Sequence, residues 1–197
     1  ERRGKTGALE AIVRAAGAGS RFGGGKLTAP WGEGLLLDGA LTAAFAAPAR
    51  TVTVVWGADP VVREAASRFA DKARETGRLH LVHSVSHAEG MGASLRSGIA
   101  SLPGDAAGAF VFLGDMPHIP HDIAPKLAEA LAAGAQAAAP VCGERRGHPA
   151  LFSAELFPAL KSLAGDRGAN WLLGAMTHGL TLIPTGDDGV LFDVDEK

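Results

Sequence analysis

A chain of 197 residues, 47% hydrophobic and 20% charged, is long and apolar enough to bury its own core. The formal net charge of −2 argues against nucleic acid as a partner, and no apolar run approaches the ~20 residues of a membrane span. One cysteine, Cys142, forms no internal disulfide and fits a reducing cytoplasm. We expect residues 1–197 to form a single domain, with residues 1–8 as a disordered tail that leads into no signal-type segment.

Short apolar runs alternate with longer helical ones through most of the chain. Strands are expected at 11–13, 51–56, 79–83, 109–113 and 135–141, and helices at 35–46, 60–75, 91–100, 123–132 and 169–175. Strands without polar alternation are typical of a parallel sheet that is covered on both faces. The sequence therefore predicts a three-layer α/β/α, doubly wound, mostly parallel sheet, which binds ligands at the carboxyl ends of its strands.

The alternation breaks in the second half. Residues 145–152 and 180–193 have the pattern of shorter strands with glycine turns, and Asp188-Gly189 is a hairpin signal. We expect these strands to form a small β-containing lobe laid over the sheet.

The loop after the first strand carries the clearest chemical signal. It reads AAGAGSRFGGGK over residues 15–26. Small side chains and successive backbone N–H groups suit a polyphosphate, and Arg21 and Lys26 add charge-assisted hydrogen bonds. A Walker loop fails because Ser20 stands where it needs glycine, and a dinucleotide fingerprint fails at Phe22. We predict a phosphate-binding loop, against the alternative of a glycine-rich surface loop.

Motifs along the chain resemble those of MobA-like nucleotidyltransferases, and in particular of molybdenum cofactor cytidylyltransferases. After the glycine-rich loop come GMGASLRSG at 90–98, LGDMP at 113–117, RGHP at 146–149, GDRGA at 165–169 and DVD at 193–195. The resemblance implies a nucleotide-diphospho-sugar transferase-like fold. It also implies Mg²⁺-dependent transfer of CMP from CTP to a phosphorylated pterin, with release of pyrophosphate and with a molybdoenzyme or its chaperone as a further partner.

The resemblance implies roles for individual residues on the donor side. Arg21, Lys26 and Asp115 are the expected catalytic residues. The expected nucleotide-binding residues are Ala15, Ala16, Gly17, Gly19, Ser20, Arg21, Lys26, Ser94 and Gly98. The alternative from the residues alone is a flexible turn in which Ser94 caps the helix. Ala16 makes the triplet A-A-G instead of the A-G-G of the guanylyl branch, which favours CTP.

Asp115 follows an apolar strand, where an unpaired carboxylate is costly and usually meets a metal, a cation or backbone donors. The residues leave metal binding and capping of the turn before Pro117 equally open, and the resemblance favours Mg²⁺. It implies a second acidic ligand near the chain end, either Asp195 or Asp193. Magnesium is typically held by one or two carboxylates together with substrate phosphates.

The turn Arg146-Gly147-His148 is the expected acceptor-binding segment. Taken alone, its composition favours a solvated basic turn, whereas the resemblance assigns it to the phosphate of the pterin.

One residue departs from the family pattern. Arg14 stands where the family has leucine, at the end of a strand that we expect to be buried. Two interpretations stay open, a phosphate contact or a weakened site. The alternative functions are transfer from GTP or another NTP to a different acceptor, and non-catalytic nucleotide binding. A nicotinamide-dependent oxidoreductase lacks support, because the third glycine and the ribose-binding acid are missing.

Overall fold

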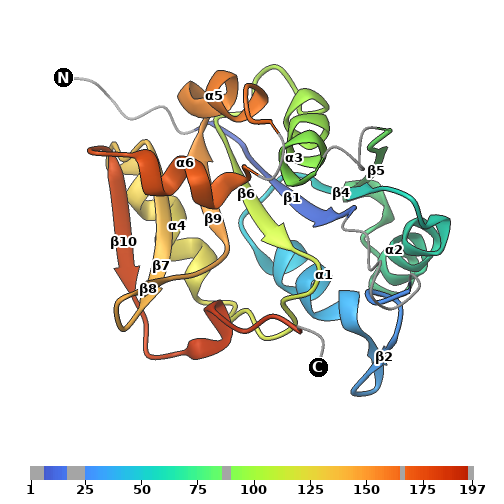
Figure 1. Cartoon of the computed structure of the whole chain (residues 1–197). Coiled ribbons are helices and arrows are strands. Elements are labelled where there is room, and N and C mark those ends of the chain that lie inside the picture. The colour runs from blue at the N-terminus through green and yellow to red at the C-terminus, as the bar shows by residue number, and fades with distance from the viewer. Residues whose placement is uncertain (1–6, 17–24, 86–89, 165–166, 195–197) are drawn as a thin grey trace.

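The computed structural model describes residues 7–16, 25–85, 90–164 and 167–194 (Figure 1). The strands are β1 (Leu9–Ala15), β2 (Pro30–Trp31), β3 (Gly34–Leu35), β4 (Val52–Trp56), β5 (Leu79–His83), β6 (Gly108–Leu113), β7 (Ala137–Cys142), β8 (Arg145–Arg146), β9 (Ala150–Ser153) and β10 (Leu180–Pro184). The helices are α1 (Leu36–Ala46), α2 (Pro60–Ala73), α3 (Met91–Ala100), α4 (Ile123–Ala132), α5 (Phe157–Lys161) and α6 (Ala169–Ala175). The alternation of strands and helices expected from the sequence is confirmed.

One central sheet organises the molecule, with neighbouring strands in the order β10-β7-β9-β6-β1-β4-β5. Strand β1 is parallel to both β4 and β6, and β5 is parallel to β4. Strand β9 runs antiparallel between β6 and β7, and β10 is parallel to β7. The register pairs Arg14 with Leu113, so β1 and β6 end side by side at the same edge of the sheet.

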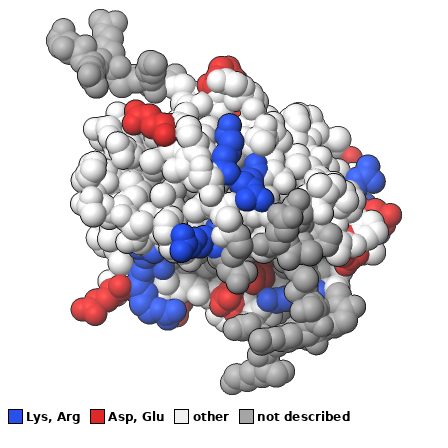
Figure 2. All heavy atoms as spheres, turned by 45° about the horizontal axis from the view of Figure 1, so that its top comes forward, with Lys and Arg blue, Asp and Glu red and all other residues white. Residues whose placement is uncertain are grey.

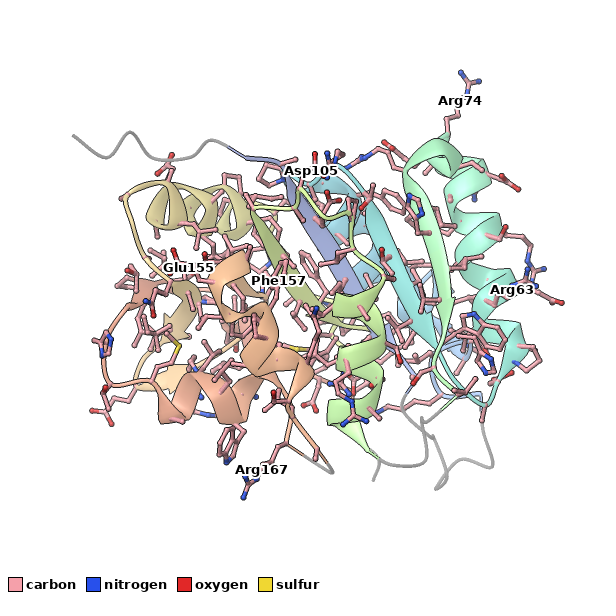
Figure 3. The ribbon with its side chains drawn as sticks, turned by 90° about the horizontal axis from the view of Figure 1, so that it is seen from above. Arg63, Arg74, Asp105, Glu155, Phe157 and Arg167 are labelled. Atoms are coloured by element: carbon pink, nitrogen blue, oxygen red, sulfur yellow. The ribbon has the colours of Figure 1, made fainter. Side chains whose placement is uncertain are left out.

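Helices cover both faces of this sheet. One apolar cluster includes Val13 of β1 and residues of α1, α2 and α4, and the other includes Ile12 of β1 and residues of α3, α5 and α6. Figure 3 shows α3, α5 and α6 together on one side of the sheet and α4 on the other. Successive side chains of a strand point to opposite faces, so Arg14 is directed to the face of Ile12. The expected three-layer α/β/α architecture is confirmed.

The strands of the second half differ from the expectation in their place. They join the central sheet instead of lying over it. Strand β9 is inserted between β6 and β7, and its Ala150, Leu151 and Phe152 are fully buried. Apolar strands of this kind need cover on both faces, which the central sheet provides.

The hairpin expected at Asp188-Gly189 is wrong. Residues 188–190 form a short 3₁₀ turn, in which the Asp187 carboxylate accepts a hydrogen bond from the Gly189 N–H at 2.8 Å. A side chain at Gly189 would collide with the carbonyl oxygen of His118, so this glycine serves close packing. Strand β10 accordingly ends at Pro184.

The N-terminal expectation needs correction at its end. The carbonyl of Ala8 accepts a hydrogen bond from the Ala107 N–H at 2.8 Å, so the chain is already ordered there. Residues 1–6 lie outside the described residues. Within the ranges that the structure describes, no helix is both long and apolar enough to cross the bilayer.

The amino-terminal edge of the sheet holds a buried ion pair. Glu10 of β1 is fully buried and accepts hydrogen bonds from Arg50 Nε at 2.7 Å and from the Thr51 N–H at 3.1 Å. Arg50 also pairs with Asp105 at 2.8 Å. This network lies at the edge of the sheet opposite to Arg14 and contributes to the fold.

Candidate functional site

Two predicted catalytic residues meet at the carboxyl edge of the sheet. After β6 the chain turns tightly, and the Gly114 N–H donates to the Arg14 carbonyl at 2.9 Å. This turn places Asp115 beside the end of β1, where its Oδ2 lies 3.2 Å from Lys26 Nζ. The two residues are 89 positions apart in the chain and about a quarter exposed. The structure thus joins the lysine that ends the glycine-rich loop to the carboxylate that follows β6.

Arg14 lies beside this pair and is held by α3. Its Nε and Nη2 atoms donate to the Ser94 hydroxyl at 3.4 and 3.3 Å. Burial lowers the pKa of Arg14 to about 10, and the nearby charge of Asp115 acts in the opposite direction. The guanidinium therefore stays charged at neutral pH in surroundings that disfavour charge.

Ser94 and Gly98 occupy different positions on α3. The N-cap of α3 is Gly90, so the capping interpretation of Ser94 does not hold, and its buried hydroxyl faces Arg14 instead. Gly98 faces the sheet, where a Cβ would lie 3.0 Å from Val55 and 3.1 Å from Ile12. Close packing of helix and sheet thus explains this glycine without any ligand.

The turn at 146–148 is folded into the protein. The His148 N–H donates to the Val190 carbonyl at 2.9 Å, and a side chain at Gly147 would collide with the same carbonyl. The His148 side chain is buried. The interpretation as a solvated turn is therefore wrong for His148.

The electrostatics of this turn are set by burial and by arginines. Burial, followed by the charges of Arg14 and Arg146, lowers the pKa of His148 to about 4, although Asp115 opposes the shift. The imidazole is therefore neutral at pH 7. Arg146 Nη2 donates to the Asn170 carbonyl at 3.1 Å, whereas its Nε is buried and has no hydrogen-bond partner in the described structure.

A pocket of about 140 Å³ is lined by both Arg14 and His148. Its lining residues come from β1, β6, the turn before β9 and the start of α6: Arg14, Val111, Leu113, His148, Gly168, Ala169, Asn170 and Trp171. The Trp171 ring is 46% exposed, and the Arg167 guanidinium lies 4.6 Å from its centroid (Figure 3). Sequence reasoning missed Asn170 and Trp171. Their position directly after the GDRGA motif was the signal that could have found them.

The two expected acidic ligands near the chain end are placed only in part. The Val194 N–H donates to the Asp115 carbonyl at 3.0 Å, which brings the segment containing exposed Asp193 alongside Asp115. Residues 191–194 form no strand, so the strand expected over 180–193 does not extend to Asp193. Asp195 lies outside the described residues. Within those residues, no group of three or more His, Cys, Asp or Glu side chains could hold a metal ion.

The glycine-rich loop is described only at its two ends. Ala15 and Ala16 are buried where the chain leaves β1, and Lys26 is placed as above. The predictions for Gly17, Gly19, Ser20 and Arg21 fall outside the described residues and stay predictions.

Positive charge is prominent on one face of the molecule. Figure 2 shows Lys and Arg side chains across the middle of this face and acidic side chains mostly toward its rim. Although the chain carries a formal net charge of −2, this distribution favours an anionic ligand on this face.

Comparisons with known proteins identify the family and structures of similar fold. The model of the MobA-like NTP transferase domain matches residues 11–180. The molybdenum cofactor cytidylyltransferase of Escherichia coli (strain K12) is 28% identical over 146 residues, which are 74% of this chain and 70% of that protein. The crystal structure of Rv0371c from Mycobacterium tuberculosis H37Rv is 24% identical, covers 91% of this chain and 89% of its own, and superposes with a TM-score of 0.74. A structure of the same protein in complex with manganese is 22% identical, covers 90% and 88%, and has a TM-score of 0.72.

Proposed function

This chain belongs to the MobA-like NTP transferase family and is an enzyme of the nucleotidyltransferase type. On that premise we propose that it transfers CMP from CTP to a phosphorylated pterin. In this reaction an oxygen of the acceptor phosphate attacks the α-phosphorus of CTP. The bond from the α-phosphorus to the leaving group breaks, and its electron pair departs with pyrophosphate. No nucleophile from the protein is required.

The observation that carries the proposal is the Lys26–Asp115 pair at the carboxyl edge of the sheet. The lysine ammonium lies 3.2 Å from the carboxylate oxygen. A triphosphate offers the lysine a more highly charged partner, so Lys26 donates to phosphate oxygens and stabilises the leaving pyrophosphate. Arg21 is proposed to assist from the same loop. Positioning and charge neutralisation are the main contributions of the protein to such transfers.

The donor set also suits a divalent cation. Asp115 offers a partly exposed carboxylate that is paired with a single lysine among the described residues, and the segment that contains Asp193 lies beside it. Mg²⁺ held by Asp115 and by Asp193 or Asp195 would neutralise the phosphate oxygens. The relative from M. tuberculosis has been crystallised with manganese, which supports a divalent metal here.

The acceptor side is proposed to include Arg146, Gly147 and His148. Neutral His148 can donate or accept a hydrogen bond at pH 7. The unpartnered Nε of Arg146 is a further donor, and an acceptor from a substrate would satisfy it. The name of the E. coli relative supports a pterin as the acceptor.

A nucleotide panel tests the proposal. With Mg²⁺, CTP should raise the melting temperature more than GTP at equal concentration, and tenfold tighter binding corresponds to about 1.4 kcal/mol of extra stabilisation at saturation. Pyrophosphate release should then require CTP, Mg²⁺ and a phosphorylated pterin together. Greater stabilisation by GTP would assign another donor, and binding without turnover of any NTP would indicate a nucleotide-binding protein without catalysis.

A further inference from the structure

We propose that Arg14 is a specificity-determining residue, which binds the phosphate group of the acceptor in the pocket that it shares with His148 and Trp171. This inference rests on the proposed function, because it takes this pocket as part of the acceptor site. Neither the family pattern, which has leucine at this position, nor the proposed mechanism above assigns Arg14 a role.

The first step is the direction in which the Arg14 side chain points. Arg14 is the sixth residue of β1, and like Ile12 it is directed to the face of the sheet covered by α3 and α6. There Ser94 holds the guanidinium through two long hydrogen bonds to one hydroxyl. These contacts fix the orientation of the planar group, but they do not neutralise its charge.

The second step is the incomplete pairing of this charge. No carboxylate among the described residues lies within ion-pairing distance of Arg14, and Asp115, whose charge acts on Arg14, pairs with Lys26 at 3.2 Å. A buried charge is costly unless it is paired. A ligand anion in the pocket would supply the missing partner, and a guanidinium can bind phosphate oxygens through two parallel hydrogen bonds.

The third step is the size and position of the pocket. A volume of about 140 Å³ is small beside the ~300–1,000 Å³ that whole drug-sized ligands occupy. It therefore suits one small group of a larger substrate. Its walls at His148 and at residues 168–171 belong to the second half of the chain, whereas Lys26 ends the loop proposed for the triphosphate. The group bound beside Arg14 is accordingly assigned to the acceptor, and the half-exposed Trp171 ring at the pocket offers a flat surface to the rest of it.

Calorimetric titration of the full chain tests this assignment with a matched pair of probes, 6-hydroxymethylpterin phosphate and unphosphorylated 6-hydroxymethylpterin. The wild-type protein should bind the phosphate on the order of 10- to 100-fold more tightly, which is the range of charge-assisted hydrogen bonds. Arg14→Leu should reduce this ratio to about 1–3, whereas Arg14→Lys should retain part of it. The Kd of Mg-CTP should change less than about threefold in either variant.

Arg63→Leu is the matched control, because Arg63 lies on α2 and points away from the molecule (Figure 3). It should behave like the wild type. Circular dichroism establishes that each variant is folded, and Arg14→Gln replaces Arg14→Leu if the leucine variant unfolds.

Each result decides between the proposals. An unchanged probe ratio in Arg14→Leu, or no preference for the phosphate in the wild type, overturns the role of Arg14. An equal loss of Mg-CTP affinity also overturns it and makes Arg14 a ligand of the donor phosphates. If CTP is not turned over but the probe ratio still depends on Arg14, the proposed transfer fails while Arg14 keeps its anion-binding role. Normal transfer with an Arg14-independent ratio refutes only the inference.

Discussion

The buried histidine of the acceptor turn makes the stability of the protein depend on pH in a defined window. The pKa of His148 is about 4 in the folded protein, against about 6.5 in an unfolded chain. The unfolded state therefore binds a proton at this histidine more readily than the folded state does. As far as His148 is concerned, the free energy of unfolding is greatest above pH 6.5. This contribution is lost as the pH falls from about 6.5 to about 4, and it amounts to about 3 kcal/mol in all.

Urea unfolding at pH 7 and pH 5, at constant ionic strength, measures this loss in the wild type and in His148→Gln. Between these pH values, the titration of His148 should lower the free energy of unfolding by about 2 kcal/mol in the wild type. Glutamine keeps a polar side chain but does not titrate, so the variant should lack this component whatever its stability at pH 7. Equal losses in both proteins would refute the reasoning. A pKa above 6 for this imidazole by NMR would refute it directly.

Three further predictions separate catalysis from folding. Lys26→Ala should reduce the rate of nucleotidyl transfer at least about 100-fold. It should change the free energy of unfolding by less than about 1 kcal/mol, because the Lys26–Asp115 ion pair is partly exposed. Near-normal turnover would exclude the phosphate-loop interpretation. Asp115→Asn should abolish metal-dependent turnover, while Asp195→Asn should raise the Mg²⁺ concentration needed for half-maximal rate. A titration of initial rates with Mg²⁺ checks both, and an unchanged rate in Asp115→Asn would contradict the metal proposal. Glu10→Gln should lower the free energy of unfolding by about 1–2 kcal/mol, because a neutral amide makes weaker hydrogen bonds to Arg50 and to the Thr51 N–H than the buried carboxylate does, while Arg50 keeps its pair with Asp105. The KM for CTP should stay unchanged at 25 °C. Denaturant melts and steady-state rates test this, and a raised KM would link the amino edge to the site.

The strands and helices around the sheet could be predicted because the pattern that indicates each one lies within a short segment of the chain. Runs such as 109–113 are apolar on both faces, which is typical of a covered parallel strand, and helices such as 123–132 follow from their apolar periodicity. The place of β9 could not be predicted in this way. Its insertion between β6 and β7 depends on pairing between segments far apart in the chain, and local patterns do not encode which strand is the neighbour.

In the candidate site, too, the sequence predicted individual residues but not the contacts between distant segments. The sequence indicated Lys26 and Asp115 separately, as a loop cation and a strand-end carboxylate, but not their contact. The sequence predicts Ser94 to contact a nucleotide or to cap a helix, yet its hydroxyl accepts a hydrogen bond from Arg14, eighty positions away in the chain. At Gly98 the sequence predicted a ligand contact where the structure shows packing of the helix on the sheet, because a glycine needed for either purpose looks the same in a sequence.

The charges at the carboxyl edge of the sheet are unevenly balanced, and this imbalance is itself an argument for an anionic substrate. Lys26, Arg14 and Arg146 all approach one neighbourhood, where Asp115 is the acid whose field reaches both Arg14 and His148. Burial of unpaired cations lowers stability, so a fold with no ligand to bind would gain from an apolar residue at position 14. A triphosphate and an acceptor phosphate together would restore the balance. Buried Arg14 by itself lowers the stability of the fold, and the same cation favours the state in which the acceptor phosphate is bound.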